Sequence, residues 1–304
     1  MRKFGLTVAA AALATGLVGT APQTADAASA AHPPQGDYSF TGFFGTFDRG
    51  ELQRGLQVYT QICAGCHGLD LIRFRELGML GYSDEQIAEF AAEFQVPDLD
   101  EWGEPTTRPA IPADSFPAPF PNDIAAAAAN GGKAPPDLSL IVKSRAHGLG
   151  SIGLNFLDML QGGEFATGTD YIAGLIGSGY VDGAPTLEQK MNCLPQTAGE
   201  SQEDYVARLE AFEIPDGTHF NQWFPGCSIG MAQPLYGDDV EYEDGTEATV
   251  EQMSHDVAVF LTWASEPYME DRKQTGIKVV LFLLVFTGIL IAVKRQTWAG
   301  VKKH

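Results

Sequence analysis

Basic residues are scarce in this chain of 304 residues, which has 19 lysines and arginines against 39 aspartates and glutamates. Seven of the basic residues lie near the two ends, so residues 31–275 carry 12 basic and 38 acidic residues, a net charge of about −26. Such a surface repels phosphate backbones, which argues against nucleic acid as a partner. The charge suits a basic protein partner, or serves solubility alone.

Long hydrophobic runs are also few, and both lie at an end of the chain. Residues 1–30 have the form of a secretory signal peptide, with Arg2-Lys3 at the start and a small-x-small cleavage site at Ala25-Asp26-Ala27 or Ala28-Ser29-Ala30. A first transmembrane helix is the alternative, but the apolar stretch is short for one. We therefore expect residues 1–30 to be cleaved and residues 31–275 to form an exported, periplasmic domain.

The second run is Ile277–Val293, which has 17 residues and one charge, Lys278. As a helix it would span about 25 Å, slightly less than the ~30 Å hydrocarbon core, and the lysine can extend its ammonium to the interface. We predict a single transmembrane helix over residues 276–294 and a cytoplasmic tail over residues 295–304. The expected location is the bacterial inner membrane, with the exported domain in the periplasm.

Cysteine is rare as well, with four residues, of which only Cys63 and Cys66 are close in sequence. They belong to Cys63-Ala64-Gly65-Cys66-His67, a C-x-x-C-H motif typical of covalent c-type haem attachment. Cysteines three residues apart on a helix project to one side and can reach both haem vinyl groups, and His67 then faces the iron. A thioredoxin-like motif would leave the histidine unexplained and needs a βαβ pattern that the sequence lacks. The presence of one such motif alone disfavours a dihaem peroxidase.

The other two cysteines, Cys193 and Cys227, lie far apart in a loop-rich segment, residues 181–250. In exported proteins the default for such a pair is a disulfide, which at this loop length stabilises by about 3–4 kcal/mol. The disulfide would fix the segment just before Met231 and so hold a second iron ligand in place. Alternatively, it would only stabilise a loop region that has a poor hydrophobic core. A haem-free zinc site built from all four cysteines is the competing hypothesis, although such sites prefer two close pairs.

A haem iron bound by one histidine needs a second axial ligand or keeps an open position. Met231 is the favoured candidate, because it lies in a loop that contains glycines and is fixed by Cys227. Met79 and Met253 fall in helical patterns, which indicates core packing. The remaining candidates are Met159, Met191, His147, His219 and His255.

Hydrophobic periodicity and turn residues predict a mostly α fold with long loops. One helix should begin at Asp48 and extend into the C-x-x-C-H motif, with both cysteines facing the core. Its expected apolar face comprises Leu52, Leu56, Tyr59, Cys63 and Cys66. Six prolines in residues 105–121 predict an ordered surface loop. Further helices are expected at 83–94, 123–130, 137–146, 155–160, 169–176 and 249–265, the last ending before Glu266-Pro267.

Three blocks of sequence point to one family. The longest begins at His219, includes HFNQWFPG, IGMA, PLY, YEDGT and FLTWASEP, and continues through Arg272-Lys273 to the apolar run near the C-terminus. The others are Arg54–Tyr59, before the haem motif, and Ala129–Ser139. In these motifs the chain resembles the cytochrome c1 family over nearly its whole mature length. The resemblance implies a cytochrome-c-like haem domain with long loop insertions, followed by one C-terminal transmembrane helix.

The resemblance also implies roles for individual residues. Met231 falls at the family's axial methionine, and Arg145 falls where an arginine pairs with a haem propionate. Asn130 falls near a propionate hydrogen-bond donor. Pro135 and Pro136 fall in the segment that packs on the proximal face of the haem, where a backbone carbonyl could fix the iron-binding histidine.

Two segments, residues 105–121 and 146–168, depart from the family pattern. The roles of His147 and Tyr171 are therefore left unassigned. The pair Cys193 and Cys227 resembles the disulfide of a bacterial subset of the family, which agrees with the pairing expected for exported cysteines.

Membership would make the chain the one-electron carrier of a dimeric bc1 complex, the quinol:cytochrome c oxidoreductase, with no substrate-turnover site of its own. A single haem c would pass electrons from the Rieske iron–sulfur protein, reduced when quinol reacts at cytochrome b, to a basic cytochrome c, soluble or tethered. The expected partners are these proteins and membrane lipid. The alternative is a free-standing, membrane-anchored c-type electron carrier.

Overall fold

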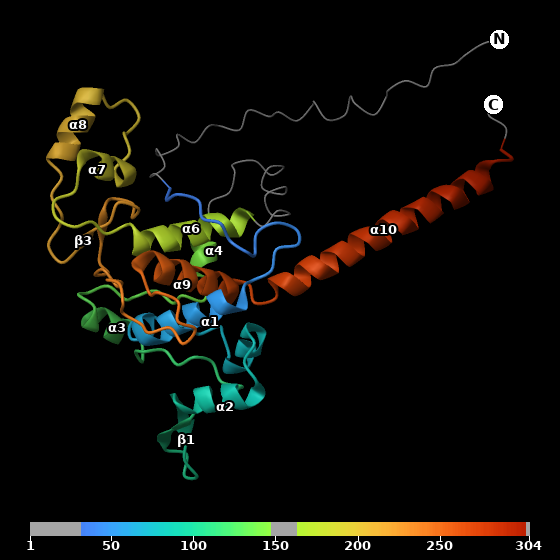
Figure 1. The fold of residues 1–304 in the computed structure, drawn as a ribbon, viewed down its shortest axis with the longest axis horizontal. Coiled ribbons are helices and arrows are strands. Elements are labelled where there is room, and N and C mark those ends of the chain that lie inside the picture. Colours follow the sequence, from blue (N-terminus) through green and yellow to red (C-terminus); the bar gives the residue numbers. More distant parts are fainter. Residues whose placement is uncertain (1–31, 147–162, 302–304) are drawn as a thin grey trace.

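The computed structural model describes residues 32–146 and 163–301, so the predicted signal peptide and the helix expected at 155–160 lie outside the described residues. Helices dominate the fold, as predicted, and a long helix extends from the body (Figure 1). The helices are α1 (Arg49–Val58), α2 (Asp84–Ala92), α3 (Asp123–Ala129), α4 (Ile141–Arg145), α6 (Gly163–Gly177), α7 (Leu187–Cys193), α8 (Gln202–Glu210), α9 (Val250–Ser265) and α10 (Met269–Trp298), with a π-helical turn at Tyr59–Cys63 and a 3-10 helix at Phe74–Leu80. The strands are β1 (Gln95–Leu99), β2 (Pro105–Pro109), β3 (His219–Phe220) and β4 (Ser228–Ile229), paired as two antiparallel hairpins.

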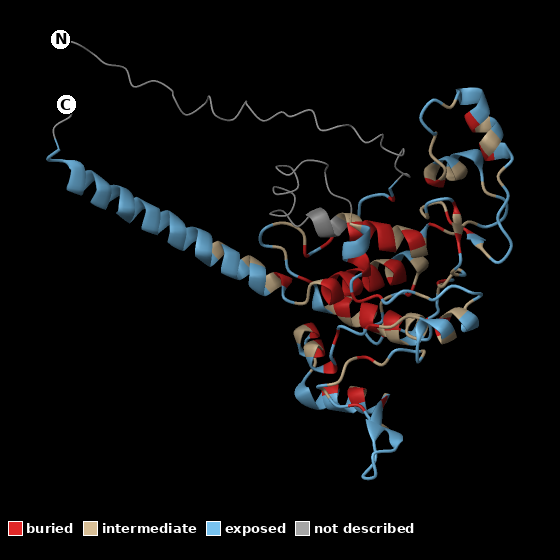
Figure 2. Cartoon of the chain, turned by 180° about the vertical axis from the view of Figure 1, so that it is seen from behind, coloured by how far each residue is buried: buried red, intermediate tan, exposed pale blue. Residues whose placement is uncertain are grey.

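Helices α1, α6 and α9 pack together at the centre, where most buried residues lie (Figure 2). The crossing of α1 and α9 is close because it occurs at Gly55. A Cβ atom on Gly55 would lie 2.2 Å from the backbone oxygen of Asp256 and 2.6 Å from the Cβ of Phe260. Any side chain at this position would push the two helices apart, so the glycine permits the close packing of the core.

Both of these helices begin where the sequence predicts. The Asp48 side chain accepts hydrogen bonds from the backbone amides of Gly50 (2.8 Å) and Glu51 (3.1 Å) and so caps α1. Thr249 caps α9 through the amide of Gln252 at 3.1 Å. Such caps satisfy the amides that the first helical turn leaves unpaired.

Other elements differ from the sequence prediction. The predicted surface loop over 105–121 includes β2, which pairs with β1 in an exposed two-stranded hairpin. Prolines are tolerated there because each strand of a two-stranded ribbon keeps one edge open. The helix expected at 137–146 is reduced to α4, and the one expected at 169–176 is the end of the longer α6.

The loop-rich segment contains two helices that periodicity alone missed. α7 and α8 are short, at 7 and 9 residues, but each has a side-chain cap. Thr186 accepts from the amide of Gln189 at 3.2 Å, and Ser201 accepts from the amide of Asp204 at 3.1 Å. These threonine and serine caps are the local signals that could have revealed the helices.

Within the described residues, α10 is the one helix long and apolar enough to cross a membrane. The residues of its most apolar stretch are not buried against the rest of the protein. The predicted break at Glu266-Pro267 separates it from α9, and α10 begins at Met269 rather than at 276. Its first turns are fixed to the body, because Arg49 forms two hydrogen bonds to Glu270 at 3.1 and 2.8 Å. The Lys273 ammonium donates to the backbone carbonyls of Phe40, Gly42 and Gly45.

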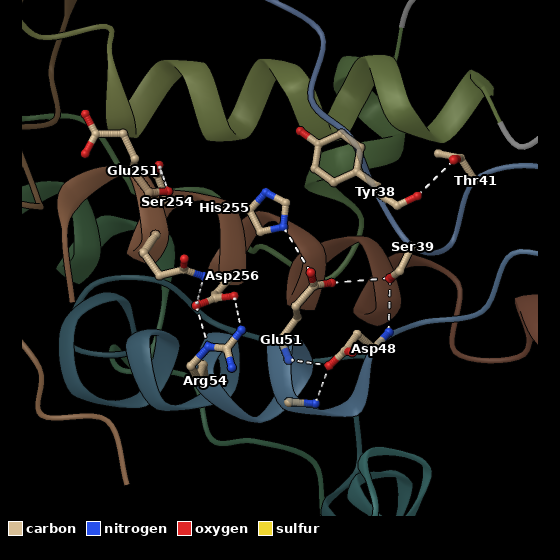
Figure 3. A network of polar contacts seen from close by, with 12 residues as sticks. Tyr38, Ser39, Thr41, Asp48, Glu51, Arg54, Glu251, Ser254, His255 and Asp256 are labelled. Carbon is tan, nitrogen blue, oxygen red and sulfur yellow. Dashed lines mark hydrogen bonds and ion pairs between the residues drawn. The ribbon is translucent and has the colours of Figure 1, made fainter. Parts of the chain in front are cut away.

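A buried ion pair connects α1 to α9 (Figure 3). The Asp256 side chain is fully buried, and Arg54 meets it with two hydrogen bonds, Nε to Oδ2 at 2.9 Å and Nη2 to Oδ1 at 3.1 Å. The remaining Nη1 of Arg54 reaches the more exposed Asp244 at 2.8 Å. A buried carboxylate is tolerated only when it is paired in this way, so the pair fixes how the two helices face each other.

The first prediction concerns this pair. We expect Arg54→Met to lower the free energy of unfolding by about 3–5 kcal/mol, because the substitution leaves Asp256 buried without a cation. The measurement is urea denaturation of the purified protein, followed by tryptophan fluorescence. The control is Asp244→Asn, which removes only the exposed contact and should cost less than about 1 kcal/mol. Equal losses in the two variants would contradict the importance of the buried contact.

Candidate functional site

The C-x-x-C-H motif lies where α1 gives way to irregular structure. The regular helix ends at Val58, and the Ala64 amide reaches back five residues to the Tyr59 carbonyl at 2.8 Å in a π-helical turn. The chain then turns sharply, since the Cys63 carbonyl accepts from the amides of Cys66 (3.1 Å) and His67 (3.0 Å).

This turn corrects one expectation from the sequence. Cys63 is half-buried against the main core, but Cys66 is exposed, so the two cysteines do not both face the core from one continuous helix. The widened turn explains the difference, because it changes the direction of the residues that follow it. Both thiols are free, and burial raises the pKa of Cys63 to about 12, which keeps that sulfur a neutral thiol.

The imidazole of His67 is held by a backbone carbonyl. Its Nδ1 lies 2.7 Å from the Pro136 oxygen, which can only accept, so Nδ1 carries the proton and Nε2 is left with its lone pair. Burial lowers the pKa of His67, which favours the neutral ring. A neutral imidazole with its tautomer fixed in this way is the form that binds a metal ion such as haem iron.

The segment around Pro136 is hydrogen-bonded to the residues that follow His67. The two carboxylate oxygens of Asp137 accept from the amides of Asp70 and Ser139, each at 2.9 Å. The Leu138 amide donates to the Gly68 carbonyl at 2.9 Å. The carbonyl that holds the imidazole is therefore itself fixed in position by several bonds.

The same segment reaches the loop that contains Met231. A Cβ atom on Gly230 would lie 3.0 Å from the Cδ of Lys133, so these two segments of the chain are in contact there. Lys133 is three residues from Pro136, a distance of at most about 11 Å along an extended chain. Residues 133–136 therefore connect the surroundings of His67 with those of Met231. The Met231 side chain is half-buried against the main core, and its carbonyl accepts from the Tyr180 hydroxyl at 2.9 Å.

Cys193 and Cys227 form the predicted disulfide, with their Cα atoms 5.0 Å apart. It joins α7 to the turn that leads into β4, and the Gly226 amide donates to the Cys193 carbonyl at 2.9 Å. The two half-cystines and Phe220 form a small cluster apart from the main core. Because two sulfurs are bonded to each other, the chain does not offer the four thiolates that the alternative zinc site would need.

The structure also shows the other residues to which the sequence analysis assigned roles. Arg145 is exposed at the end of α4, close to the Tyr171 phenol. Burial raises the pKa of Tyr171, and the positive charge of Arg145 opposes that change. Asn130 ends α3 and donates from its amide to the Ala126 carbonyl at 2.8 Å. Pro135 is half-buried and Pro136 exposed.

Of the seven other candidate axial ligands, two lie outside the described residues, three pack or pair within the body, and two are exposed. His147 and Met159 lie outside the described residues. Met253 is fully buried in the core, and His255 lies 3.4 Å from the Glu51 carboxylate. Met79 packs against the core as predicted, while Met191 and His219 are exposed.

Tyr180 is a residue that the sequence analysis missed. It follows α6 as a lone tyrosine after Gly179, and no local pattern links it to residue 231, which is 51 positions away. Burial raises the pKa of Tyr180 above its usual range, so the phenol keeps the proton that it donates.

Residues 38–301 match the model of the Cytochrome C1 family. The chain is 41% identical over 271 residues to cytochrome c1 of Rhodospirillum rubrum, an alignment that covers 88% of this chain and 87% of that protein. It is 40% identical over 284 residues to the mitochondrial cytochrome c1 haem protein of Saccharomyces cerevisiae, covering 92% and 77%.

A further relative is longer than this chain. The protein named cytochrome b/c1 of Bradyrhizobium diazoefficiens is 43% identical over 271 residues, which are 88% of this chain but 36% of that protein. The chain thus corresponds to about a third of the length of that relative.

The second prediction concerns the disulfide. We expect the paired substitution Cys193→Ala and Cys227→Ala to lower the free energy of unfolding by about 3–4 kcal/mol, because the unfolded chain regains the freedom of a loop of more than thirty residues. Urea denaturation measures the loss. The wild-type protein unfolded with a thiol reductant should match the variant, whereas unchanged stability would mean that the disulfide does not constrain the unfolded chain.

Proposed function

The chain belongs to the cytochrome c1 family, and on this premise we propose that it is the haem-bearing, electron-carrying subunit of a bc1 complex, the quinol:cytochrome c oxidoreductase. The observation that carries the proposal is the arrangement at the C-x-x-C-H motif. Cys63 and Cys66 are free, although the other two cysteines are joined, and the Pro136 carbonyl fixes the tautomer of His67. These are the groups that covalent haem attachment requires.

The residues present fit one c-type haem. Cys63 and Cys66 would hold it through thioether bonds, and His67 Nε2 and Met231 Sδ would be the two axial ligands. Haem with this ligation supplies a one-electron centre whose potential the thioether raises relative to two histidines. Arg145 and Asn130 would face the propionates, and an iron held by both His67 and Met231 would have no position left for a substrate.

The proposed location follows from the two ends of the chain. Residues 1–30 would direct export, α10 would hold the protein in the bacterial inner membrane, and residues 295–304 would remain in the cytoplasm. The haem domain, residues 31–275, would then face the periplasm. This orientation is supported by the sequence of the first 30 residues and by the exposed, apolar surface of α10.

The proposed route takes an electron from the Rieske iron–sulfur protein, next to cytochrome b in a dimeric complex, and delivers it to a soluble or tethered cytochrome c. The net charge of residues 31–275, about −26, favours a basic acceptor, because opposite charges steer short-lived encounters between redox proteins. The chain itself would contribute electron transfer to the enzyme, without a substrate-turnover site.

The third prediction tests the haem. We expect the mature protein to keep one haem after denaturation, seen as a haem-stained band and as one added haem in the mass of the chain. The double variant Cys63→Ser and Cys66→Ser should lose it, and the double alanine variant at the other two cysteines should keep it. A colourless mature chain, or haem that remains attached in the double serine variant, would overturn the assignment.

The fourth prediction separates the bc1 subunit from the alternative, a free-standing membrane-anchored electron carrier. Mild detergent extraction of membranes and affinity purification of the full chain should recover a b-type cytochrome and a Rieske centre in constant proportion to its haem. Optical and electron paramagnetic resonance spectra measure the two partners. Recovery of the chain with its haem but without either partner would favour the free-standing carrier.

A further inference from the structure

The loop that contains Met231 has little support from its own backbone. Among the described residues, 230–235 take part in no hydrogen bond between two backbone groups, although β4 ends just before them. The contact that fixes the backbone at residue 231 is the hydrogen bond from the Tyr180 hydroxyl to the Met231 carbonyl, at 2.9 Å. The hydrogen-bond partner of this carbonyl is therefore a side chain from another part of the fold.

Tyr180 is itself well placed to do this, because the residues before it are fastened to the turn that leads toward Met231. The Asn221 amide group donates to the Leu175 carbonyl at 2.8 Å, and the Gln222 backbone amide donates to the Gly179 carbonyl at 2.9 Å. Gly179 allows this approach, since a Cβ atom there would lie 2.4 Å from the Asn221 side-chain oxygen. The end of α6 and the turn thus form one fixed unit.

The side-chain bonds of the same turn point to the same conclusion. Gln222 donates from its side chain to the Ser178 carbonyl at 2.7 Å, and the Trp223 indole donates to the Ser178 hydroxyl at 3.0 Å. The disulfide holds the far side of the turn at Cys227. Tyr180 therefore follows the end of α6, which several hydrogen bonds fix to the turn. Met231, to which it donates, lies beyond the last backbone hydrogen bond of the β3–β4 hairpin.

A methionine thioether is a neutral ligand, so its persistence on an iron depends on where the protein places it. We propose that Tyr180 is a positioning residue that keeps Met231 on the haem iron by holding its backbone carbonyl. This inference rests on the proposed function, because it takes Met231 as the axial ligand. Tyr180 touches neither the iron nor the partner proteins in this role, and acts through the main chain of residue 231 alone.

The test uses the full-length, haem-loaded protein and carbon monoxide, which binds ferrous haem only when the sixth position is open. Tyr180→Phe keeps the ring and removes the donor. A lost neutral hydrogen bond of ordinary strength should increase the fraction of open haem, and hence the rate of carbon monoxide binding, about fivefold. The reduction potential should fall, because the thioether stabilises the ferrous state.

Tyr205→Phe is the matched control. The Tyr205 hydroxyl also donates to a backbone carbonyl at 2.9 Å, that of Leu194, but it lies on α8 rather than beside the Met231 loop. Its side chain is buried, whereas that of Tyr180 is half-buried. If the loss of any tyrosine hydroxyl bonded to a backbone carbonyl loosened the whole protein, carbon monoxide binding would rise similarly in the two variants. Tyr205→Phe should therefore leave both the carbon monoxide rate and the potential unchanged.

Met231→Leu completes the experiment, because it removes the ligand itself and should open the iron fully. If Met231→Leu binds carbon monoxide while Tyr180→Phe behaves like Tyr205→Phe, the positioning role is wrong and the axial assignment stands. If Met231→Leu stays closed to carbon monoxide, the methionine is not the ligand, and the positioning role falls with that assignment. Covalently attached haem in all three variants excludes loss of the cofactor as the cause.

Discussion

The close crossing of α1 and α9 at Gly55 is the constraint on which the rest of the structure depends. Little room separates the two helices there, and the buried pair of Arg54 and Asp256 fixes how they face each other. Helix α1 leads directly into the turn that contains the two free cysteines, and α9 leads into the long apolar helix α10. One contact between helices thus places both the C-x-x-C-H motif and the candidate membrane span.

The candidate site is assembled from three segments that are distant in sequence, and each proposed axial ligand has a hydrogen bond to a backbone carbonyl at or beside it. The Pro136 carbonyl accepts from His67, and the Met231 carbonyl accepts from Tyr180. Residues 133–136 lie between the two, in contact with Gly230 at one end and with His67 at the other. Carbonyl oxygens suit this task because they are fixed by the main chain and cannot change their protonation state.

The features that could be predicted from sequence are those determined by neighbouring residues. The caps at Asp48 and Thr249, the break at Glu266-Pro267 and the apolar α10 each depend on a few consecutive side chains, and all are found. The π-helical turn was missed, because its residues are compatible with an ordinary helix and the difference is decided by packing. Tyr180 was missed for a related reason, since its partner is reached only through the folded chain.

The long separation between α1 and α9 has a consequence for the order in which the protein is made. Arg54 and Asp256 are 202 residues apart, so α1 lacks its main packing partner until almost all of the chain has been synthesised. The segment with Cys63 and Cys66 is therefore made long before the helix against which α1 packs, and it is still without its tertiary contacts when it is synthesised.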